Sequence, residues 1–494
     1  MKPPTVKVQL GNRWAVFDCD PDVQVRLKKF FRYSVPGAQF SEAYRCGSWD
    51  GFQNMLQRGR VATGLFLEQQ ETLGKKFQLI LTDERRSPAF KDVTSIRQLR
   101  PYQENALVAM ISASTCGGLI LSGTGTGKTA LAAAFFARLQ GQALFVCDEL
   151  ALLSQSRAAL AKDLGEEVGI VGSGRFELQR VTCATIQTLH KRRHTSVFRK
   201  WFRTLEVVIV DEVHVAINKR NADVIQQIAA KAVFGLTATL EVEKPHVHLP
   251  AVAMCGPVVF EYPISQGVED GYLSDGVIYR VEFYDPLTGM APAYPTLVDG
   301  KKVWIKAGSQ AAEYRRRVCL NKSRNDCVEG IVREGLRCGR KIVVLVDWKV
   351  HLRMLDNRFS DVKHRSLSGE IKPAARLEAM REMDAGELDL ILASKVFAKG
   401  VDIQSVNLIL DCCGLPSRNN AIQRYGRGVR KNQKEKVLFY VDIFDVGNRF
   451  EAAGRSRLKA LQELGSPIIH EQWKNDAKAV LKAMEEINGP DIPS

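Results

Sequence analysis

The stretch Ser122-Gly-Thr-Gly-Thr-Gly-Lys-Thr129 decides the fold of the chain around it. A short apolar segment, Leu119–Leu121, precedes the stretch, and an alanine-rich segment of helical character, Ala130–Leu139, follows it. A glycine-rich turn between a strand and a helix directs backbone N–H groups toward phosphate oxygens, and the helix N-terminus adds a favourable dipole. In such a loop the lysine binds the β- and γ-phosphates and the hydroxyl that follows it ligates Mg²⁺. We therefore expect these residues to bind a nucleoside triphosphate and its metal: Gly123, Thr124, Gly125, Thr126, Gly127, Lys128 and Thr129.

The segments on both sides of this loop alternate between strand-like and helical patterns. Apolar runs such as Val207–Val210 and Lys341–Val346 are separated by helical stretches over residues 99–257, and again over residues 260–450. Such alternation predicts an α/β fold with parallel sheets built from βαβ units. Residues 285–306 are rich in proline and glycine, which predicts a long loop or a hairpin.

The alternation also suggests where the domains begin and end. Residues 1–97 combine short strand-like runs, among them Val61–Leu67, with one basic helix, which is typical of a small α+β accessory domain. We expect a first α/β domain over residues 98–258, a second over residues 259–450, and a helical extension over residues 451–494.

Composition limits the classes of partner. The chain has 494 residues, a formal net charge of +15 and an isoelectric point near 9.3, which favour a polyanionic partner, although solubility alone would also account for the charge. No apolar run approaches the length of a membrane-spanning helix, and Met1–Val8 lack the apolar core of a secretory signal, so we expect a cytoplasmic protein with no membrane partner. Its 11 cysteines lack metal-like spacing, so we expect reduced thiols and no zinc.

Two carboxylates end the apolar run Val207–Val210. In open α/β sheets ligands bind at the carboxyl ends of the strands, which is where Asp211 and Glu212 fall. We expect Asp211 to hold Mg²⁺ and Glu212 to orient and deprotonate the attacking water. The alternative is an ordinary acidic pair that caps a helix, and the upstream phosphate loop favours the catalytic interpretation.

Arginines near the end of the second α/β block offer the complementary charge. Arg427 and Arg430 lie three residues apart within Gln423–Arg430, on one face if the segment is helical. A guanidinium on the γ-phosphate offsets the charge that develops in the transition state and can be worth about 10³ to 10⁵ in rate. The alternative is a basic, solvated helix face.

Basic and aromatic residues are mixed in two neighbouring segments, His190–His194 and Phe198–Arg203. Arg192 and Arg193 of the first segment could grip phosphates, and the rings of the second could stack on bases. The alternative is an amphipathic surface helix whose rings point inward.

Taken in order, the motifs resemble those of superfamily 2 helicases of the DExH type. Ser122–Thr129 is similar to motif I, Asp211–His214 to motif II, Thr237–Thr239 to motif III, Ala398–Asp402 to motif V and Gln423–Arg430 to motif VI. The resemblance implies two tandem RecA-like domains with ATP and Mg²⁺ as cofactors. It assigns adenine recognition to Gln103, a place beside the nucleotide to Gly400 and Asp402, catalytic roles to Gln423, Arg427 and Arg430, and coupling of hydrolysis to movement to His214, Thr237 and Thr239.

The resemblance also implies contacts with a nucleic-acid strand. Thr182–Leu189 is similar to motif Ib, which places Thr185 and Gln187 on the strand, and Ser368 and Gly369 lie where the second domain of the family touches it. Motif IV, around Val346–Leu352, is diffuse.

The segment Tyr44–Phe52, with Trp-Asp-Gly at 49–51, resembles the accessory domain of UvsW-like phage recombination helicases. That resemblance implies an ATP-dependent DNA helicase or translocase on branched or forked duplexes, with single-stranded DNA as a further partner and Trp49 at the DNA. A core aromatic is the alternative for Trp49. Two other functions stay open: an ATP-dependent RNA helicase, and an ATP-gated nucleic-acid clamp without productive hydrolysis.

Overall fold

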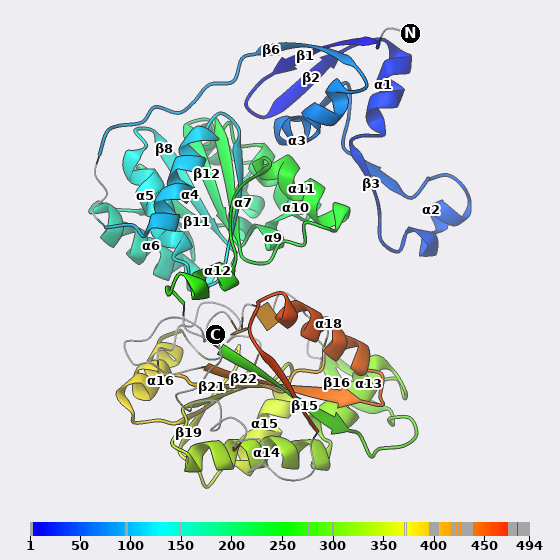
Figure 1. The fold of residues 1–494 in the computed structure, drawn as a ribbon, viewed down its shortest axis with the longest axis vertical. Coiled ribbons are helices and arrows are strands. Elements are labelled where there is room, and N and C mark those ends of the chain that lie inside the picture. Colours follow the sequence, from blue (N-terminus) through cyan, green and yellow to red (C-terminus); the bar gives the residue numbers. More distant parts are fainter. Residues whose placement is uncertain are drawn as a thin grey trace. The chain divides into compact units, whose positions relative to one another are not determined.

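In a computed structural model the chain forms two compact units that follow one another in sequence at Pro263 and Ile264, and each is described by itself (Figure 1). The structure describes residues 3–93, 97–148, 150–273, 276–298, 301–369, 371, 373–394, 405–415, 421–422, 424–425, 438–472 and 482. Within these ranges no helix is both long enough and apolar enough to cross a bilayer.

The first unit begins with a small mixed sheet in the order β5-β2-β1-β6. Its strands are β1 (Thr5–Leu10), β2 (Trp14–Asp18), β5 (Arg60–Ala62) and β6 (Gln78–Asp83). Helices α1 (Pro21–Lys28) and α3 (Thr63–Gly74) cover one face, because the alternate residues Val6, Val8 and Leu10 of β1 are buried. Strands β3 (Arg32–Ser34) and β4 (Phe52–Asn54) pair antiparallel and carry the short helix α2 (Glu42–Arg45) on an arm that projects from this sheet (Figure 1).

An eight-stranded sheet forms the rest of the first unit, in the order β10-β9-β11-β8-β12-β13-β7-β14, and only the edge pair β10–β9 is antiparallel. Its strands are β7 (Gly117–Ser122), β8 (Gln142–Cys147), β9 (Gly169–Gly172), β10 (Arg175–Glu177), β11 (Val181–Thr185), β12 (Leu205–Asp211), β13 (Ala232–Thr237) and β14 (Val258–Tyr262). The predicted parallel α/β sheet is therefore confirmed.

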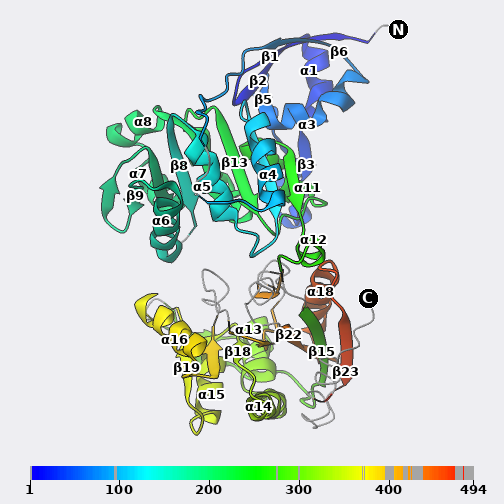
Figure 2. The same cartoon turned by 60° about the vertical axis from the view of Figure 1, so that its left-hand side comes forward.

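Helices cover both faces of the eight-stranded sheet because successive residues of its strands point to opposite sides. On one face Val207 and Ile209 pack under α4 (Pro101–Ser112), α5 (Lys128–Arg138) and α6 (Leu150–Leu164), which lie together in Figure 2. On the other face Val208 and Val210 pack under α7 (Ile186–Arg192), α8 (Ser196–Phe202), α9 (Val213–Ala216), α10 (Lys219–Gln226) and α11 (Pro245–Cys255).

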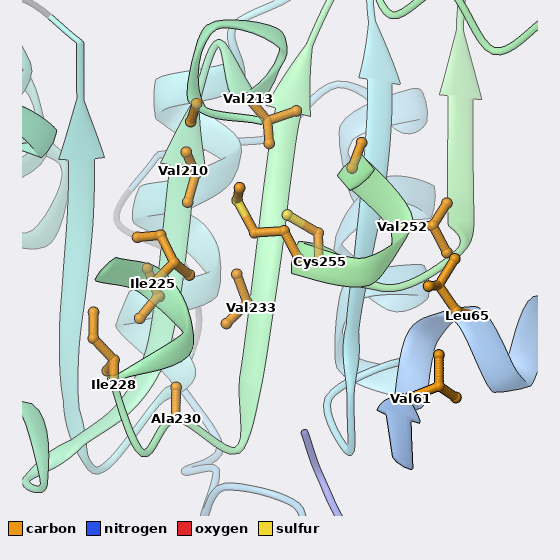
Figure 3. Packing of buried hydrophobic residues seen from close by; sticks show 14 of the residues in the cluster. Val61, Leu65, Val210, Val213, Ile225, Ile228, Ala230, Val233, Val252 and Cys255 are labelled. Carbon is orange, nitrogen blue, oxygen red and sulfur yellow. The ribbon is translucent and has the colours of Figure 1, made fainter. Parts of the chain in front are cut away.

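The small sheet and the eight-stranded sheet share one apolar core. Leu65 of α3 packs toward Val252 of α11, as Figure 3 shows. A Cβ on Gly64 would lie 2.4 Å from the carbonyl oxygen of Val252, so this glycine permits the close approach of the two helices. The amide of Asn12 donates to the carbonyl oxygens of Thr115 and Lys231, at 2.7 and 3.0 Å. The small mixed sheet and its helices are thus packed directly onto the domain of the eight-stranded sheet.

The second unit contains a seven-stranded parallel sheet in the order β19-β20-β18-β21-β22-β15-β23. Its strands are β15 (Gly276–Tyr284), β18 (Ile342–Leu345), β19 (His364–Leu367), β20 (Leu390–Ala393), β21 (Leu408–Asp411), β22 (Leu438–Val446) and β23 (Ile468–Gln472). Ile342 and Val344 pack with α14 (Lys322–Arg337) and α15 (Lys349–Arg358). Val343 and Leu345 pack on the other face with α12 (Ile264–Glu269), α16 (Pro373–Ala385) and α18 (Glu451–Gln462).

An antiparallel hairpin, β16 (Tyr294–Val298) and β17 (Lys301–Ile305), is inserted after β15 and is followed by α13 (Gln310–Tyr314). It forms its own two-stranded sheet. The proline- and glycine-rich segment 285–306 therefore contains the hairpin that was one of its two predicted forms.

Two expected elements differ from the structure. The run Val61–Leu67 was expected to be a strand, but only Arg60–Ala62 is extended and helix α3 begins at Thr63. Residues 451–494 were expected to be helical, and α18 agrees, but Ile468–Gln472 forms a strand that pairs with β15. Short apolar runs fit either periodicity, and here contacts with distant segments decide between them.

Candidate active site at the edge of the first sheet

The glycine-rich loop joins β7 to α5, as its flanking pattern predicts. Gly125 and Gly127 have φ of 88° and 80°, in the left-handed region that glycine adopts without strain. The Lys128 ammonium lies over the start of the loop, where it donates to the carbonyl oxygens of Ser122 and Gly123 at 3.2 and 3.4 Å. Thr129 is the second residue of α5. The loop therefore brings together an ammonium, a hydroxyl and a helix N-terminus, which are groups that bind polyphosphate.

Gln103, the expected adenine-binding residue, lies beside this loop. A Cβ on Gly127 would approach the side-chain nitrogen of Gln103 to 2.5 Å. The Gln103 side-chain oxygen accepts from the backbone N–H of Arg100 at 3.0 Å, which caps the start of α4. The side chain is thus held in place next to the nucleotide loop.

The sequence analysis did not single out Tyr102. Its ring stacks on Tyr262 with centroids 4.0 Å apart and planes 6° from parallel. The carbonyl oxygen of Tyr262 accepts from the N–H of Gly123 at 3.0 Å, so the stack ties α4 to the first residue of the loop. The sequence signal that could have indicated this role is the position of Tyr102, an aromatic residue directly before Gln103.

The acidic pair lies at the same edge of the sheet as the loop. Asp211 ends β12, which is separated from β7 only by β13, and Glu212 follows it. Glu212 has φ of 48°, an uncommon backbone state for a residue with a side chain, and its N–H is bonded to Asp211 Oδ1 at 3.0 Å. Glu212 Oε2 is buried, has no hydrogen-bond partner among the described atoms, and lies 3.4 Å from His214 Nδ1.

The three expected coupling residues contact one another. His214 Nδ1 lies 2.9 Å from the hydroxyl of Thr237 and 3.4 Å from that of Thr239. The Thr237 hydroxyl also accepts from the N–H of Thr239 at 3.1 Å. Both threonines are fully buried and the His214 side chain is 11% exposed, so this small network joins the ends of β12 and β13.

The expected strand-contact residues of the first domain differ in exposure. Thr185 is only 1% exposed and its hydroxyl caps α7, so its side chain does not reach the surface as the DNA-contact assignment required. Gln187 donates to the backbone oxygen of Asp148 at 2.5 Å, Arg192 is exposed, and Arg193 donates to the carbonyl oxygen of His190.

The aromatic side chains of the basic segment near α8 point inward. Phe198, Trp201 and Phe202 are between 2% and 5% exposed, as the amphipathic alternative predicts. Trp49 is neither a core residue nor fully exposed: it is half-buried in the arm and its indole N–H donates to the carbonyl oxygen of Phe52 at 2.8 Å.

In the second unit the structure describes part of the expected site. Ser368 and Gly369 follow β19, and the Arg376 guanidinium donates to the Gly369 carbonyl oxygen at 3.2 Å. The remaining expected residues lie outside the described ranges: Gly400, Asp402, Gln423, Arg427 and Arg430.

Arg424, to which the motifs assign no role, is buried in the second unit. Its guanidinium donates to both oxygens of Asp411 at 3.0 and 2.8 Å and lies 3.8 Å from Asp347. Burial alone would raise the pKa of Asp411, but the charges of Arg424 and Arg457 lower it to about 2. The Tyr440 hydroxyl donates to Asp411 as well, at 2.5 Å. Arg424 therefore anchors its segment to the ends of β18 and β21.

Two protein-family models match this chain. The family model described as "Type III restriction enzyme, res subunit" matches residues 96–242, and the model "Helicase conserved C-terminal domain" matches residues 324–432. The two models together span just over half of the chain.

Individual relatives share low sequence identity with this chain, but the matches extend over most of both proteins. The chain is 24% identical over 445 residues to "DNA 3'-5' translocase XPB2" of Sulfurisphaera tokodaii, covering 83% of this chain and 96% of that protein. It is 21% identical over 465 residues to "ATP-dependent DNA helicase uvsW" of Enterobacteria phage T4, covering 87% and 88%.

A solved structure, "S. cerevisiae Dbp5 bound to RNA and ADP BeF3", shares the fold with a TM-score of 0.53 at 14% identity, covering 79% of this chain and 94% of that one. The ordered motifs, the sheet-edge site and both family models agree. The chain belongs to superfamily 2 of the helicases and is an ATP-dependent helicase or translocase, an NTPase.

Proposed function

We propose that this enzyme uses ATP hydrolysis to move along DNA and to remodel branched DNA. The observation that carries the proposal is the extent of the similarity to two proteins named for DNA translocase and DNA helicase activity. Those matches take in 83% and 87% of this chain, which is more than residues 98–450 make up, so they continue into the segments outside the two helicase domains. The net charge of +15 suits a partner that is a polyanion.

The residues at the edge of the first sheet fit ATP and Mg²⁺. The Lys128 ammonium would exchange its bonds to the loop carbonyls for bonds to the β- and γ-phosphates, and Gln103, which lies beside the loop, would bind the adenine edge. A hydroxyl and a carboxylate, from Thr129 and Asp211, are the hard oxygen ligands that Mg²⁺ prefers. Bound there, the metal would neutralise charge on the phosphate oxygens.

Glu212 is the group that would prepare the attacking water. Its Oε2 is buried, has no hydrogen-bond partner within the part of the chain that the structure describes, and lies 3.4 Å from His214 Nδ1. A carboxylate held in this way accepts a proton from water, and the strained backbone at φ 48° keeps it in position. By their resemblance to motifs V and VI we also assign nucleotide-dependent roles to residues that lie outside the described ranges: Gly400, Asp402, Gln423, Arg427 and Arg430.

The arm of the accessory domain is the surface that we assign to the DNA branch. Phe40 is 76% exposed and Tyr44 is 44% exposed, and Arg45 is exposed between them and Trp49. Exposed rings with a neighbouring guanidinium suit unpaired bases and backbone phosphates at a junction. We also propose that the DNA strand is contacted by Gln187, Arg192, Ser368 and Gly369. Thr185 makes no such contact, and its hydroxyl instead caps α7.

A matched panel of forked, four-way and linear duplex DNA tests this function. The enzyme should process the branched forms with ATP and should prefer them to linear duplex and to RNA duplex. Deleting residues 1–97 is unsuitable, because Val6 and Leu65 share a core with Met254 and the truncation would expose it. Point variants on the arm are cleaner.

We expect Phe40→Ala and Arg45→Gln to reduce the branch preference by several-fold. The matched controls Val25→Ala and Lys76→Gln remove an exposed apolar group and an exposed charge elsewhere in the same domain. If the arm variants keep the full preference, the arm is not the branch-binding surface. If the wild type processes RNA duplex and ignores DNA, the choice of DNA is wrong.

A further inference from the structure

The inserted hairpin of the second unit is fixed at its base by two consecutive arginines. Arg316 donates to the carbonyl oxygen of Gly289 at 3.0 Å. Arg317 pairs with Asp285 and with Glu313, both at 2.7 Å. Glu313 in turn accepts from the N–H of Ala291 at 2.8 Å. These bonds hold the segment that leads into β16 against α13 and the turn that follows it, and so fix the base of the hairpin.

The arginines belong to a π-helical turn, Arg315–Cys319, which continues α13. Turns of this kind are rare and occur frequently at functional sites. Here the turn directs Arg316 and Arg317 to the clamp and leaves Arg315 to a different partner, since its guanidinium carbon lies 4.4 Å from the ring centroid of Tyr294 on β16.

A cavity of about 470 Å³ opens between β16 and the start of α15. Tyr294, Arg315, Trp348 and Lys349 line it. Trp348 is half-buried and rests on Tyr314, with ring centroids 4.7 Å apart. Rings of fixed position next to a guanidinium and an ammonium form a surface on which a base can stack while its phosphate is neutralised.

The carboxylate of Asp347 also lines the cavity, and it accepts hydrogen bonds from the protein. It accepts from the Tyr314 hydroxyl at 2.8 Å and from the N–H of Leu415 at 3.2 Å. The Arg424 guanidinium lies 3.8 Å away. With Asp347 hydrogen-bonded to the protein, Arg315 and Lys349 place two positive charges along the lining of the cavity.

We propose that this cavity is a binding subsite for one unstacked nucleotide of single-stranded DNA, with the base against Tyr294 and Trp348 and the phosphates at Arg315 and Lys349. The inference rests on the proposed DNA-dependent activity and adds a place on the second domain where the strand is held by a base. An acidic peptide would use the two cations but would leave both ring faces unused.

Equilibrium binding of a fluorescein-labelled oligodeoxythymidylate to the full chain tests the subsite. We expect Tyr294→Ala and Arg315→Gln each to weaken binding about tenfold. Arg315→Gln should also reduce the slope of log K against log salt by about 1, because one phosphate contact is lost. The matched controls Tyr284→Ala and Arg381→Gln remove an exposed ring and an exposed guanidinium elsewhere in the same unit and should bind like the wild type.

An oligonucleotide of the same length with abasic sites separates stacking from charge. On it the cost of Tyr294→Ala should vanish, whereas the cost of Arg315→Gln should persist. Thermal melting of each variant confirms that the protein is folded. Pocket variants that bind like the controls, or a Tyr294→Ala cost that is equal with and without bases, would overturn the subsite.

Measurements on the wild-type protein distinguish an incorrect subsite from an incorrect proposed function. If the wild type neither binds DNA nor hydrolyses ATP faster in its presence, the proposed function is wrong. If the wild type does both and the pocket variants match the controls, only the subsite is wrong.

Discussion

His214 Nδ1 and the Thr237 hydroxyl lie 2.9 Å apart and join the end of β12, which Asp211 and Glu212 follow, to the neighbouring strand β13. The same histidine nitrogen lies 3.4 Å from Glu212 Oε2. We propose that a change in the charge around Glu212 during hydrolysis reaches β13 through this histidine.

Thr237→Val tests this link, because valine keeps the shape of threonine and removes the hydroxyl. We expect ATP hydrolysis to stay within about threefold of the wild type, and DNA unwinding to fall by about fivefold or more, since one buried hydrogen bond is worth on the order of 1 kcal/mol. Thr237→Ser should restore unwinding. Equal losses of hydrolysis and unwinding would show that the hydroxyl serves catalysis and not coupling.

Gly127→Ala should damage the nucleotide site by a steric clash. Gly127 and Gly174 both have φ of 80°, so alanine meets the same backbone strain at either position, roughly 1–2 kcal/mol. At Gly127 the new Cβ would also lie 2.5 Å from the Gln103 side chain, whereas at Gly174 nothing lies within 4 Å. Titration with a fluorescent ATP analogue should therefore show affinity loss of more than about tenfold for Gly127→Ala.

Gly174→Ala is the control for that experiment, and its ATP affinity should match the wild type. Similar affinity losses in both variants would mean that backbone strain, and not the position of Gln103, decides the result.

Gly64→Ala should separate the accessory domain from the first helicase domain. The added Cβ would lie 2.4 Å from the Val252 carbonyl oxygen, and overpacking of this kind costs typically 1–3 kcal/mol. Gly74→Ala at the end of the same helix has nothing within 4 Å and should be neutral or slightly stabilising. Urea unfolding compares the two, and an unchanged unfolding free energy for Gly64→Ala would contradict the tight docking.

His351 should make the second unit sensitive to mild acid. Burial lowers its pKa well below the usual range, the Arg324 charge lowers it further, and the ring is bonded to Asn325 at 2.9 Å. The unfolded chain takes up a proton below about pH 6.5 and the folded state does not, so stability is complete above that pH and falls as the pH drops, by up to about 1.4 kcal/mol per unit.

Urea unfolding between about pH 7.5 and 5.5 measures this slope, a range that spans the ordinary histidine pKa. His351→Gln should flatten it, while His194→Gln, at an exposed position, should keep the wild-type slope. Identical slopes in all three proteins would mean that His351 is not kept neutral by the fold.

The parts of the fold that sequence predicts are those whose signals are local. The loop at Gly123–Thr129 and the carboxylates after Val210 lie within single strand–turn–helix units, so periodicity and turn chemistry place them. Their approach to one another also follows, because parallel strands deliver their carboxyl ends to one edge.

The parts that sequence does not predict depend on distant contacts. Leu65 lies in a helix because α3 packs on α11, and nothing near it in sequence carries that information. Arg424 is a buried anchor because Asp411 and Asp347 arrive from two other strands, which no pattern around residue 424 indicates. Thr185 fits a strand-contact motif, yet its hydroxyl is used up by the helix cap.

Steady-state ATP hydrolysis with and without forked DNA, in the wild type and in Lys128→Ala, tests the central claim most directly. The account predicts that DNA stimulates the wild type and the exposed control Lys162→Ala alike, and that Lys128→Ala loses at least about a hundredfold in rate, because the ammonium that stabilises the transferred phosphate is gone. A Lys128→Ala enzyme that hydrolyses ATP as fast as the wild type would contradict the account.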